Sequence, residues 1–475
     1  MTMTTLKLST LALSVALVAG CAQHTSFETP QTQNPAQWQH GQYAAKQAIT
    51  SQWWKQFNDP QLNQLVDQVL KSNNDLAIAA LTLRQARLEA RLDNNELYPE
   101  LTSSTSASKS KSLKNGTSST SYSTDLSVSY EIDLWGKLSR TADASEWSAL
   151  ASKQDLESTA QTLVATTAQL YWQVGYLTQR IALSESDIKD ARETLNMTQS
   201  QYKNGSVSRL NILEAQRALY ALEATNSDYI QQLVEARNAL AILFNQPPQK
   251  MDLTINALPD GTLPDIEPGI PAELLTRRPD VKSALFSLKS ALATEDATDA
   301  SYLPGISLTG ALGGSSSQLK NLLRDPIGTL GAELTLPFLS WNEMQINKDI
   351  AKVKYQSAIV TYRKTLYEAF EDVDNALSAR INYQVQQGKL QDQYNASAEA
   401  ERIYRSQYDN GAIGITDLLD AQENTRSAKA SLLENRYNQL VNLATIYQTL
   451  GGDDVMQDDQ ALIKATTNIE SNQSK

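Results

Sequence analysis

LESTAQTLVATTAQLYWQVGYLTQRI, residues 156–181, carries a leucine at every seventh position. The leucines, followed by the residues four positions after each, are Leu156, Leu163, Leu170, Leu177, Ala160, Thr167, Val174 and Ile181. A seven-residue repeat of this kind predicts a coiled-coil seam. Residues 137–204 contain no proline and only one interior glycine, Gly175. We therefore expect one helix, on the order of 100 Å long at about 1.5 Å per residue.

Shorter helices are expected beside this long one, at residues 61–97 and 207–245. Each is roughly half as long by the same rise, so two of them placed end to end would match the long helix. A second long helix is expected at residues 341–410. A solvated dimeric coiled coil would show the same heptads, so the helices alone do not specify a channel.

The chain repeats itself at a separation of about 200 residues. YKNG at residues 202–205 matches YDNG at 408–411, and LEAQ at 213–216 matches LDAQ at 419–422 in the same register. The long helices and strands follow the same order in both halves. The chain is therefore expected to be a tandem duplication of one structural unit.

Glycine ends the first matched segment in both halves. Gly205 and Gly411 suit the left-handed residue that closes a helix, so we expect helix-tip turns there, after Tyr202 and Tyr408. Between the halves, prolines stand at positions that no continuous helix tolerates. These are Pro247, Pro248, Pro259, Pro264, Pro268, Pro271 and Pro279. Residues 246–278 are expected to form a connector.

Alternation of apolar and polar residues predicts strands in both halves. In the first half, residues 122–134 carry the apolar members Leu126, Val128, Tyr130 and Ile132. In the second half, the apolar members of two strands are Ile306, Leu308, Leu312, Leu330, Ala332, Leu334, Leu336 and Phe338. A fourth strand, near residues 101–108, is serine-rich and is placed by the repeat alone. A lipid-facing exterior with an aqueous lumen fits the pattern, as would a soluble sheet with one buried face.

Four strands are too few for a closed membrane barrel, which needs about eight or more. Beyond the first 20 residues, no apolar stretch approaches the roughly 20 residues of a spanning helix, so strands must make any membrane passage. The barrel is therefore expected to be shared between chains. Residues 109–119 and 313–326, rich in Ser, Gly and Lys, would form its outer loops.

The first residues indicate export. Lys7 precedes an apolar run that is too short for a mature spanning helix and that reads as a signal peptide. Small residues lead to Cys21, the only cysteine, as lipoprotein-type cleavage requires. We expect a covalent lipid, including palmitate, on Cys21; an ordinary signal peptide with an incidental cysteine is the alternative. Ala22 is not the aspartate that favours inner-membrane retention in bacterial lipoproteins, and this resemblance implies outer-membrane delivery.

Several function classes are excluded by composition. The formal net charge of -12 argues against nucleic acid as a partner, because phosphate neutralisation needs clustered Lys and Arg. Only two histidines exist, His24 and His40, and no cysteine remains for catalysis or thiolate ligation. Zinc sites and His-based triads are thereby excluded. We expect no enzyme, no metal site and no cofactor other than the lipid.

Four motifs together resemble the outer-membrane factor family, the TolC-like ducts, and specifically the lipoprotein branch associated with drug efflux. They are WWKQFNDP at 53–60, YEIDLWGK at 130–137, RRPDV at 277–281 and the segment 411–422. The resemblance runs over nearly the whole mature chain. Residues 53 and 54 are nevertheless expected to be packing anchors, since aromatic side chains bury large apolar areas. Pro279 with Asp280 is an ordinary helix start.

The resemblance implies an α+β membrane protein that forms a homotrimer in the outer-membrane lipid. Twelve strands would form one β-barrel above a long antiparallel coiled-coil helical barrel that extends into the periplasm. It also implies the function, passive outflow of drugs and other small toxic compounds, and hence multidrug resistance. The implied partners are an inner-membrane efflux transporter and a periplasmic adaptor (membrane fusion) protein.

The expected organisation follows the repeat. In chain order, it comprises a signal peptide at 1–20, a lipid-anchored equatorial segment at 21–60, a first repeat at 61–245, the connector at 246–278, a second repeat at 279–450 and a polar tail at 451–475.

The family places acidic residues around the constricted periplasmic entrance, which the resemblance carries to Asp417 and Asp420. Threefold symmetry would set six carboxylates around one axis, where their repulsion favours bound cations. The first repeat departs from this pattern, with Asn211 opposite Asp417 and Glu214 opposite Asp420. Arg209 lies opposite Ile415, so the closing contacts need not resemble those of other members. Alternatively, acids in a first helical turn merely complement the helix dipole.

Two other functions stay open from the sequence. A protein-secretion (type I) duct would have the same design, because the partner pump and not the duct selects cargo. A lipid-anchored coiled-coil scaffold of the periplasm would explain the heptads but not the strands.

Overall fold

The computed structural model describes residues 25–40, 52–248, 255, 257–266, 271 and 277–452. The expected signal peptide, Cys21 and nearly all of the expected tail lie outside these residues. The chain forms two compact units. The described parts of unit 1 are residues 25–32, 82–154 and 282–365, and those of unit 2 fall within 33–81, 155–281 and 366–452.

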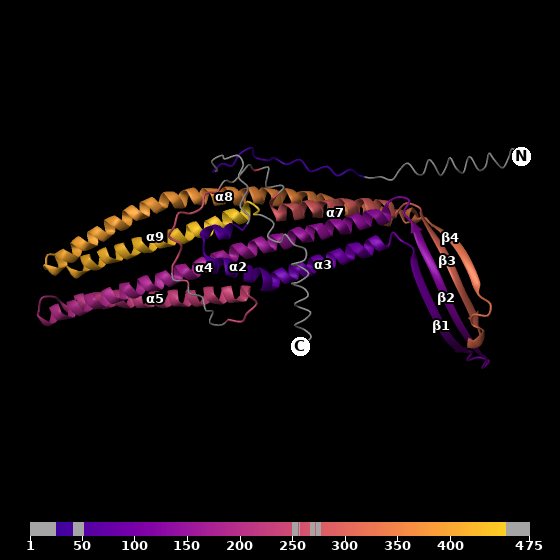
Figure 1. The fold of residues 1–475 in the computed structure, drawn as a ribbon, viewed down its shortest axis with the longest axis horizontal. Coiled ribbons are helices and arrows are strands. Elements are labelled where there is room, and N and C mark those ends of the chain that lie inside the picture. The colour runs from indigo at the N-terminus through magenta and orange to yellow at the C-terminus, as the bar shows by residue number, and fades with distance from the viewer. Residues whose placement is uncertain are drawn as a thin grey trace. The chain divides into compact units, whose positions relative to one another are not determined.

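Unit 1 contains the strands, which form one antiparallel sheet in the order β1-β2-β3-β4 (Figure 1). The strands are β1 (Glu100–Lys111), β2 (Ser118–Ile132), β3 (Gly305–Ser316) and β4 (Ile327–Thr335). Sequence neighbours pair throughout. The two halves of the chain therefore each supply one hairpin, and β2 joins β3 across the repeat.

The register sorts the side chains of this sheet onto two faces. Ile132 lies opposite Ile306, which lies opposite Leu334, whereas the neighbouring row joins Ser307 to Glu131 and Glu333. Because successive residues of a strand point to opposite faces, one face is apolar and the other is polar. The large apolar side chains that this single chain leaves exposed include Leu101, Leu126, Val128, Leu308, Leu312, Leu330 and Leu334.

The serine-rich first strand is held partly by hydroxyl pairs. The Thr102 and Ser127 hydroxyl oxygens are 2.7 Å apart, and those of Ser106 and Ser123 are 2.8 Å apart. Cross-strand hydroxyl pairs of this kind stabilise a ladder. The ladder itself continues past the expected residues 101–108, from Glu100 to Lys111.

Three strand expectations need correction. The strand expected at 122–134 ends at Ile132, and β4 ends at Thr335. Pro337 lacks the N–H that would continue the ladder, so Leu336 and Phe338 lie outside the strand. The loops expected at 109–119 and 313–326 are also shorter, because the strands extend into them.

A short polar junction connects the sheet to the first long helix. The Asp133 carboxylate accepts hydrogen bonds from the backbone N–H groups of Leu138 (3.0 Å) and Ser139 (2.9 Å). It thereby satisfies two of the free donors at the helix start. The Trp135 indole donates to the Pro304 carbonyl at 2.8 Å. These contacts give the YEIDLWGK motif a structural role at the strand-to-helix turn.

Both long helices expected from the sequence are present. They are α4 (Lys137–Lys203), with 67 residues, and α8 (Trp341–Asp409), with 69 residues. Their shorter companions are α2 (Pro60–Ser72), α3 (Asn74–Asn95), α5 (Arg209–Leu243), α7 (Pro279–Ser301) and α9 (Ile415–Thr449). The described residues also form the 3-10 turns η1 (Trp53–Phe57), η3 (Leu319–Asn321) and η4 (Pro337–Leu339).

The single helix expected at residues 61–97 is wrong, because Asn73 divides it into α2 and α3. The Asn73 side chain accepts from the Leu76 N–H at 3.0 Å, which caps α3, and donates to the Leu243 carbonyl at 3.0 Å. The Asn74 amide also donates to Asn245 at 2.7 Å. The start of α3 thus meets the end of α5, as the expected end-to-end placement of short helices requires.

Unit 2 holds most of the coiled-coil seam. Leu156, Ala160, Leu163, Thr167, Val174 and Leu177 are all buried. An aromatic cluster packs beside it, in which Trp53 stacks on Tyr447 with 5.0 Å between ring centroids. Trp53 and Trp54 are 6% and 2% exposed, so the expectation that they are packing anchors is confirmed.

None of the helices in the described parts of the chain combines the length and hydropathy needed to traverse a bilayer.

Candidate functional site

Two turns with the same backbone pattern end the long helices of unit 2. After α4, the Ser206 N–H donates to the Gln201 carbonyl and the Gly205 N–H to the Tyr202 carbonyl, both at 2.9 Å. This pair of bonds is the Schellman motif, in which a left-handed residue closes the helix. Gly205 accordingly has a φ of +70°.

The turn after α8 repeats this pattern. The Ala412 N–H donates to the Gln407 carbonyl at 2.8 Å, and the Gly411 N–H to the Tyr408 carbonyl at 2.9 Å. Gly411 has a φ of +73°. The sequence match between the two segments therefore corresponds to the same turn.

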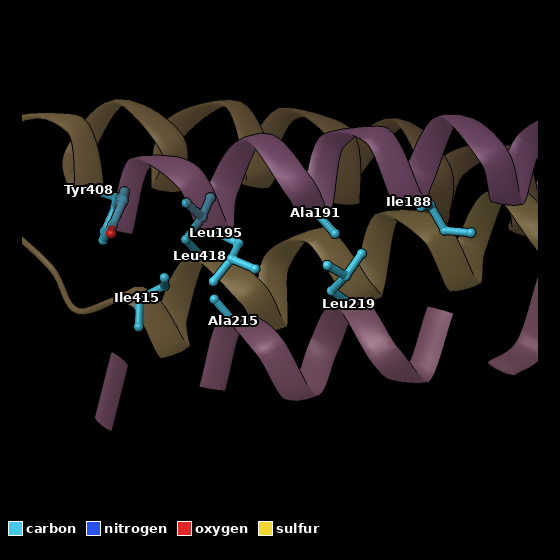
Figure 2. Packing of buried hydrophobic residues seen from close by; sticks show 8 residues of the cluster. All are labelled: Ile188, Ala191, Leu195, Ala215, Leu219, Tyr408, Ile415 and Leu418. Carbon is cyan, nitrogen blue, oxygen red and sulfur yellow. The ribbon is translucent and has the colours of Figure 1, made fainter. Parts of the chain in front are cut away.

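A buried apolar cluster joins the four helices next to these turns (Figure 2). Its members are Ile188, Ala191 and Leu195 of α4, Ala215 and Leu219 of α5, Tyr408 of α8, and Ile415 and Leu418 of α9. Ile415 and Leu418 are 0% and 1% exposed. Because both belong to the first turn of α9, their burial fixes which residues of that turn face outward.

Asp417 is the acid of this first turn and Asp420 follows in the next turn, and both are exposed. Glu214 is half-buried and accepts a hydrogen bond from the Thr416 hydroxyl at 3.3 Å. The structure thus brings Glu214 of the first repeat to the start of α9. Asn211 instead stays at its own helix start, where its side-chain oxygen accepts from the Ser208 N–H (3.1 Å) and hydroxyl (2.7 Å).

The two tip tyrosines have different environments. Tyr202 is 44% exposed, whereas Tyr408 is 4% exposed. The Tyr408 hydroxyl donates to the Gln201 side-chain carbonyl at 2.7 Å. This bond connects α8 to α4 and, with the bond from Thr416 to Glu214, links the two hairpins at their tips.

A charged groove of about 480 Å³ lies between α4, α5 and α9. Its charged and aromatic lining residues are Arg180, Asp187, Arg217, Tyr229, Asp420, Glu423 and Arg426. Asp420 thus contributes to this groove, whereas Asp417 is not part of its lining. Arg180 lies over the Tyr229 ring at 4.7 Å and donates to its hydroxyl. Arg426 pairs with Glu423 at 2.9 Å.

Sequence reasoning missed Asp187, the most perturbed carboxyl of the groove. Burial raises its pKa to about 6, against the opposing effect of Arg426, Lys429 and Arg180. The only signal in the sequence is its spacing seven residues after Arg180, which places both on one helix face. Within the described residues, no cluster of His, Cys, Asp and Glu is arranged to hold a metal ion.

Three features of the chain define an outer-membrane export duct. They are a tandem pair of very long helices, a four-stranded sheet with an exposed apolar face, and polar helical tips. Comparison with known proteins supports this class. The family model described as "Outer membrane efflux protein" matches residues 65–246 and 270–452, well over half of the chain. The chain belongs to the outer membrane efflux protein family.

Individual relatives match over nearly their whole length. Toxin and drug export protein A of Aggregatibacter actinomycetemcomitans is 29% identical, covering 95% of this chain and 99% of the relative. The cation efflux system protein CusC of Escherichia coli K12 is 29% identical, covering 94% and 99%. The crystal structure of the Campylobacter jejuni CmeC outer membrane channel has a TM-score of 0.84 at 26% identity, covering 95% and 98%.

These findings confirm the family resemblance. The protein is an outer-membrane efflux channel that extends into the periplasm and serves transport, and the family contains channels rather than enzymes.

Proposed function

We propose that three copies of the chain form one duct, through which drugs and other small toxic compounds leave the cell passively. An inner-membrane pump and a periplasmic adaptor deliver the cargo. In this assembly twelve strands close a barrel in the outer membrane, and the helices continue it into the periplasm.

The unpaired edges of the sheet support the proposed assembly. Within the described residues, β1 pairs only with β2 and β4 only with β3, so each outer strand leaves a row of backbone groups unpaired. A bilayer has no water to satisfy such groups, and a membrane sheet must therefore close on itself. Four strands cannot close, and joining β1 of one copy to β4 of the next supplies the missing bonds.

An apolar stripe on α8 supports the same assembly. Ile346, Ile350, Val353 and Val360 follow helical spacing on one face and are 51%, 46%, 61% and 63% exposed. Contiguous exposed apolar surface of this kind marks an interface. A neighbouring copy of the chain would cover it.

The anchor and the gate are further parts of the proposal. A lipid on Cys21 would supplement the barrel, since one or two acyl chains add membrane affinity without spanning the bilayer.

At the tips, Asp417 and Asp420 of three copies would bring six carboxylates around the entrance. Their repulsion would favour cations at a closed entrance, and adaptor binding would spread the tips to open it.

Assembly is tested by isolating the protein from outer membranes and placing it in a planar bilayer. We expect heat-resistant trimers that conduct ions. Leu334→Arg should impair insertion or assembly by about 2–4 kcal/mol, because Leu334 would face lipid. Glu333→Arg, on the polar face, is the matched control. A conducting monomer, or damage from Glu333→Arg alone, would contradict the shared barrel or its orientation.

Cargo is tested by drug susceptibility in a deletion strain, with a secreted-protein assay in parallel. Relatives named for toxin and drug export and for cation efflux are both 29% identical to this chain, so identity alone does not select the cargo. Increased drug susceptibility with unchanged protein secretion supports drug efflux. The reverse result would assign the duct to protein secretion.

A further inference from the structure

The first described residues of the chain, 25–32, lie against helices of unit 1. The Thr25 hydroxyl donates to the Asp296 carboxylate of α7 at 2.6 Å. The Phe27 side chain is half-buried, although both of its neighbours along the chain are exposed. Two side chains of this segment therefore make defined contacts with the folded unit.

Phe27 completes an aromatic cage around one lysine. Trp147 of α4 and Phe286 of α7 stack with 5.8 Å between ring centroids and 18° between planes. The Lys289 ammonium nitrogen lies 4.3 Å from the Trp147 ring, 5.2 Å from the Phe27 ring and 5.8 Å from the Phe286 ring. An ammonium within about 6 Å of a ring centroid is attracted by the ring quadrupole.

The surface around the cage is hollowed. A cavity of about 240 Å³ has Thr25 and Phe27 in its wall, together with Trp147, Lys289, Leu292 and Asp296. The N-terminal segment thus forms one border of this depression between α4 and α7, and its one aromatic side chain is half-buried there.

This position limits how far the chain before it can reach. A chain spans at most about 3.3–3.6 Å per residue, so the six residues from Cys21 to the caged Phe27 reach at most about 20 Å. Farther along, the Gln33 N–H donates to the Tyr367 hydroxyl at 3.3 Å in unit 2. If only this contact held the segment, Cys21 could move about 40 Å away from it.

We propose that the cage formed by Trp147, Phe286 and Lys289 is a binding site for the chain's own N-terminal segment. Its ligand is the Phe27 ring, and its role is to limit how far the lipid-bearing Cys21 can move from α4 and α7. This role rests on the proposed lipid anchor, whereas the binding of Phe27 does not.

Engineered disulfide formation tests the site in the full-length protein in lipid nanodiscs. Thr25→Cys with Asp296→Cys places two thiols where the native side chains already touch, and we expect rapid crosslinking within one chain. Adding Phe27→Ala should slow crosslinking about tenfold, because the ring no longer holds the segment. Lys289→Met should act in the same direction, and the two changes together should slow it no further than either alone.

Lys282→Met, two turns earlier on α7, is the matched control and should leave the rate within about twofold. Crosslinking that is equally fast with Phe27→Ala, or that joins two chains, would overturn the binding site. The intact mass of the mature protein is read on the same samples. A mass without lipid would remove the anchor and the positioning role, while the crosslinking rate still decides whether the cage binds Phe27.

Discussion

The α4–α5 and α8–α9 hairpins end in the same turn but differ in what surrounds it. Their tips share the glycine, the Schellman hydrogen bonds and a tyrosine three residues before the glycine. Yet Tyr408 is buried where Tyr202 is exposed, and Ile415 is fully buried where its counterpart Arg209 is exposed. The duplication has therefore kept the backbone geometry and changed the contacts.

The difference continues along the second hairpin. Asn435, Gln439 and Asn442 of α9 are buried, and Gln439 donates to Gln387 of α8 at 3.0 Å. The repeat places Tyr229, Leu233 and Ala236 at these positions in α5. Buried polar networks specify one arrangement of the elements that they join. The second hairpin is thus the more precisely fixed pair, and it carries the exposed acids at its tip.

The largest expected effect comes from truncating the buried tip residue. Ile415→Ala should lower the stability of the tip by about 2–5 kcal/mol, since it leaves a cavity in the cluster. Arg209→Ala, the matched change in the first hairpin, should stay within about 0.5 kcal/mol. Local unfolding free energies from hydrogen exchange at the two tips provide the measurement. Equal effects would abolish the distinction between the hairpins.

The shared turn should respond equally in both hairpins. Gly205→Ala and Gly411→Ala each force a side chain into a left-handed conformation, which costs about 1–2 kcal/mol. Hydrogen exchange or proteolysis of the tips should detect the same loss for each variant. A clear inequality would show that the two turns are not equivalent.

Removal of the tyrosine hydroxyl should change the stability of the two hairpins by different amounts. Tyr408→Phe deletes the hydrogen bond to Gln201 and should cost about 0.5–1.5 kcal/mol. Tyr202→Phe should have no measurable effect, because Tyr202 is exposed. Thermal unfolding of both variants at one pH checks the pair, and a larger loss in Tyr202→Phe would reverse the assignment.

The smallest expected effect concerns pH and α4. The pKa of Asp187 is raised from 3.8 to about 6, whereas its repeat counterpart is Gln393, which does not titrate. Between about pH 4 and pH 6 the folded chain therefore holds a proton that the unfolded chain has released. Stability falls as pH rises through this window, by about 1 kcal/mol or less after allowance for solvent screening.

Asp187→Asn should remove this dependence, and Gln393→Asn should leave it unchanged. Melting temperatures of the variants and the wild type across pH 4–7 give the comparison. Persistence of the same slope in Asp187→Asn would place the titrating group elsewhere.

Regular patterns were predictable from the sequence, and single side chains that act through tertiary contacts were not. The lack of proline in residues 137–204 predicted α4 to within one residue of its end. The break at Asn73 was missed because it depends on the Leu243 carbonyl, which is distant in the sequence. The burial of Asp187 was not predictable, because it depends on α5 and α9, which line the same groove. Similarly, no pattern indicated that Glu214 would meet Thr416.

The most direct test of the account compares the acids at the two tips in single channels. Asp417→Ala with Asp420→Ala should change conductance, reduce cation selectivity and weaken block by divalent cations, because the exposed carboxylates of the second hairpin would surround the entrance. Asn211→Ala with Glu214→Ala is the matched pair in the first hairpin and should alter these properties far less. Unchanged current, selectivity and block in the Asp417 and Asp420 variant would contradict the proposed gate and leave both acids as ordinary residues of a helix start.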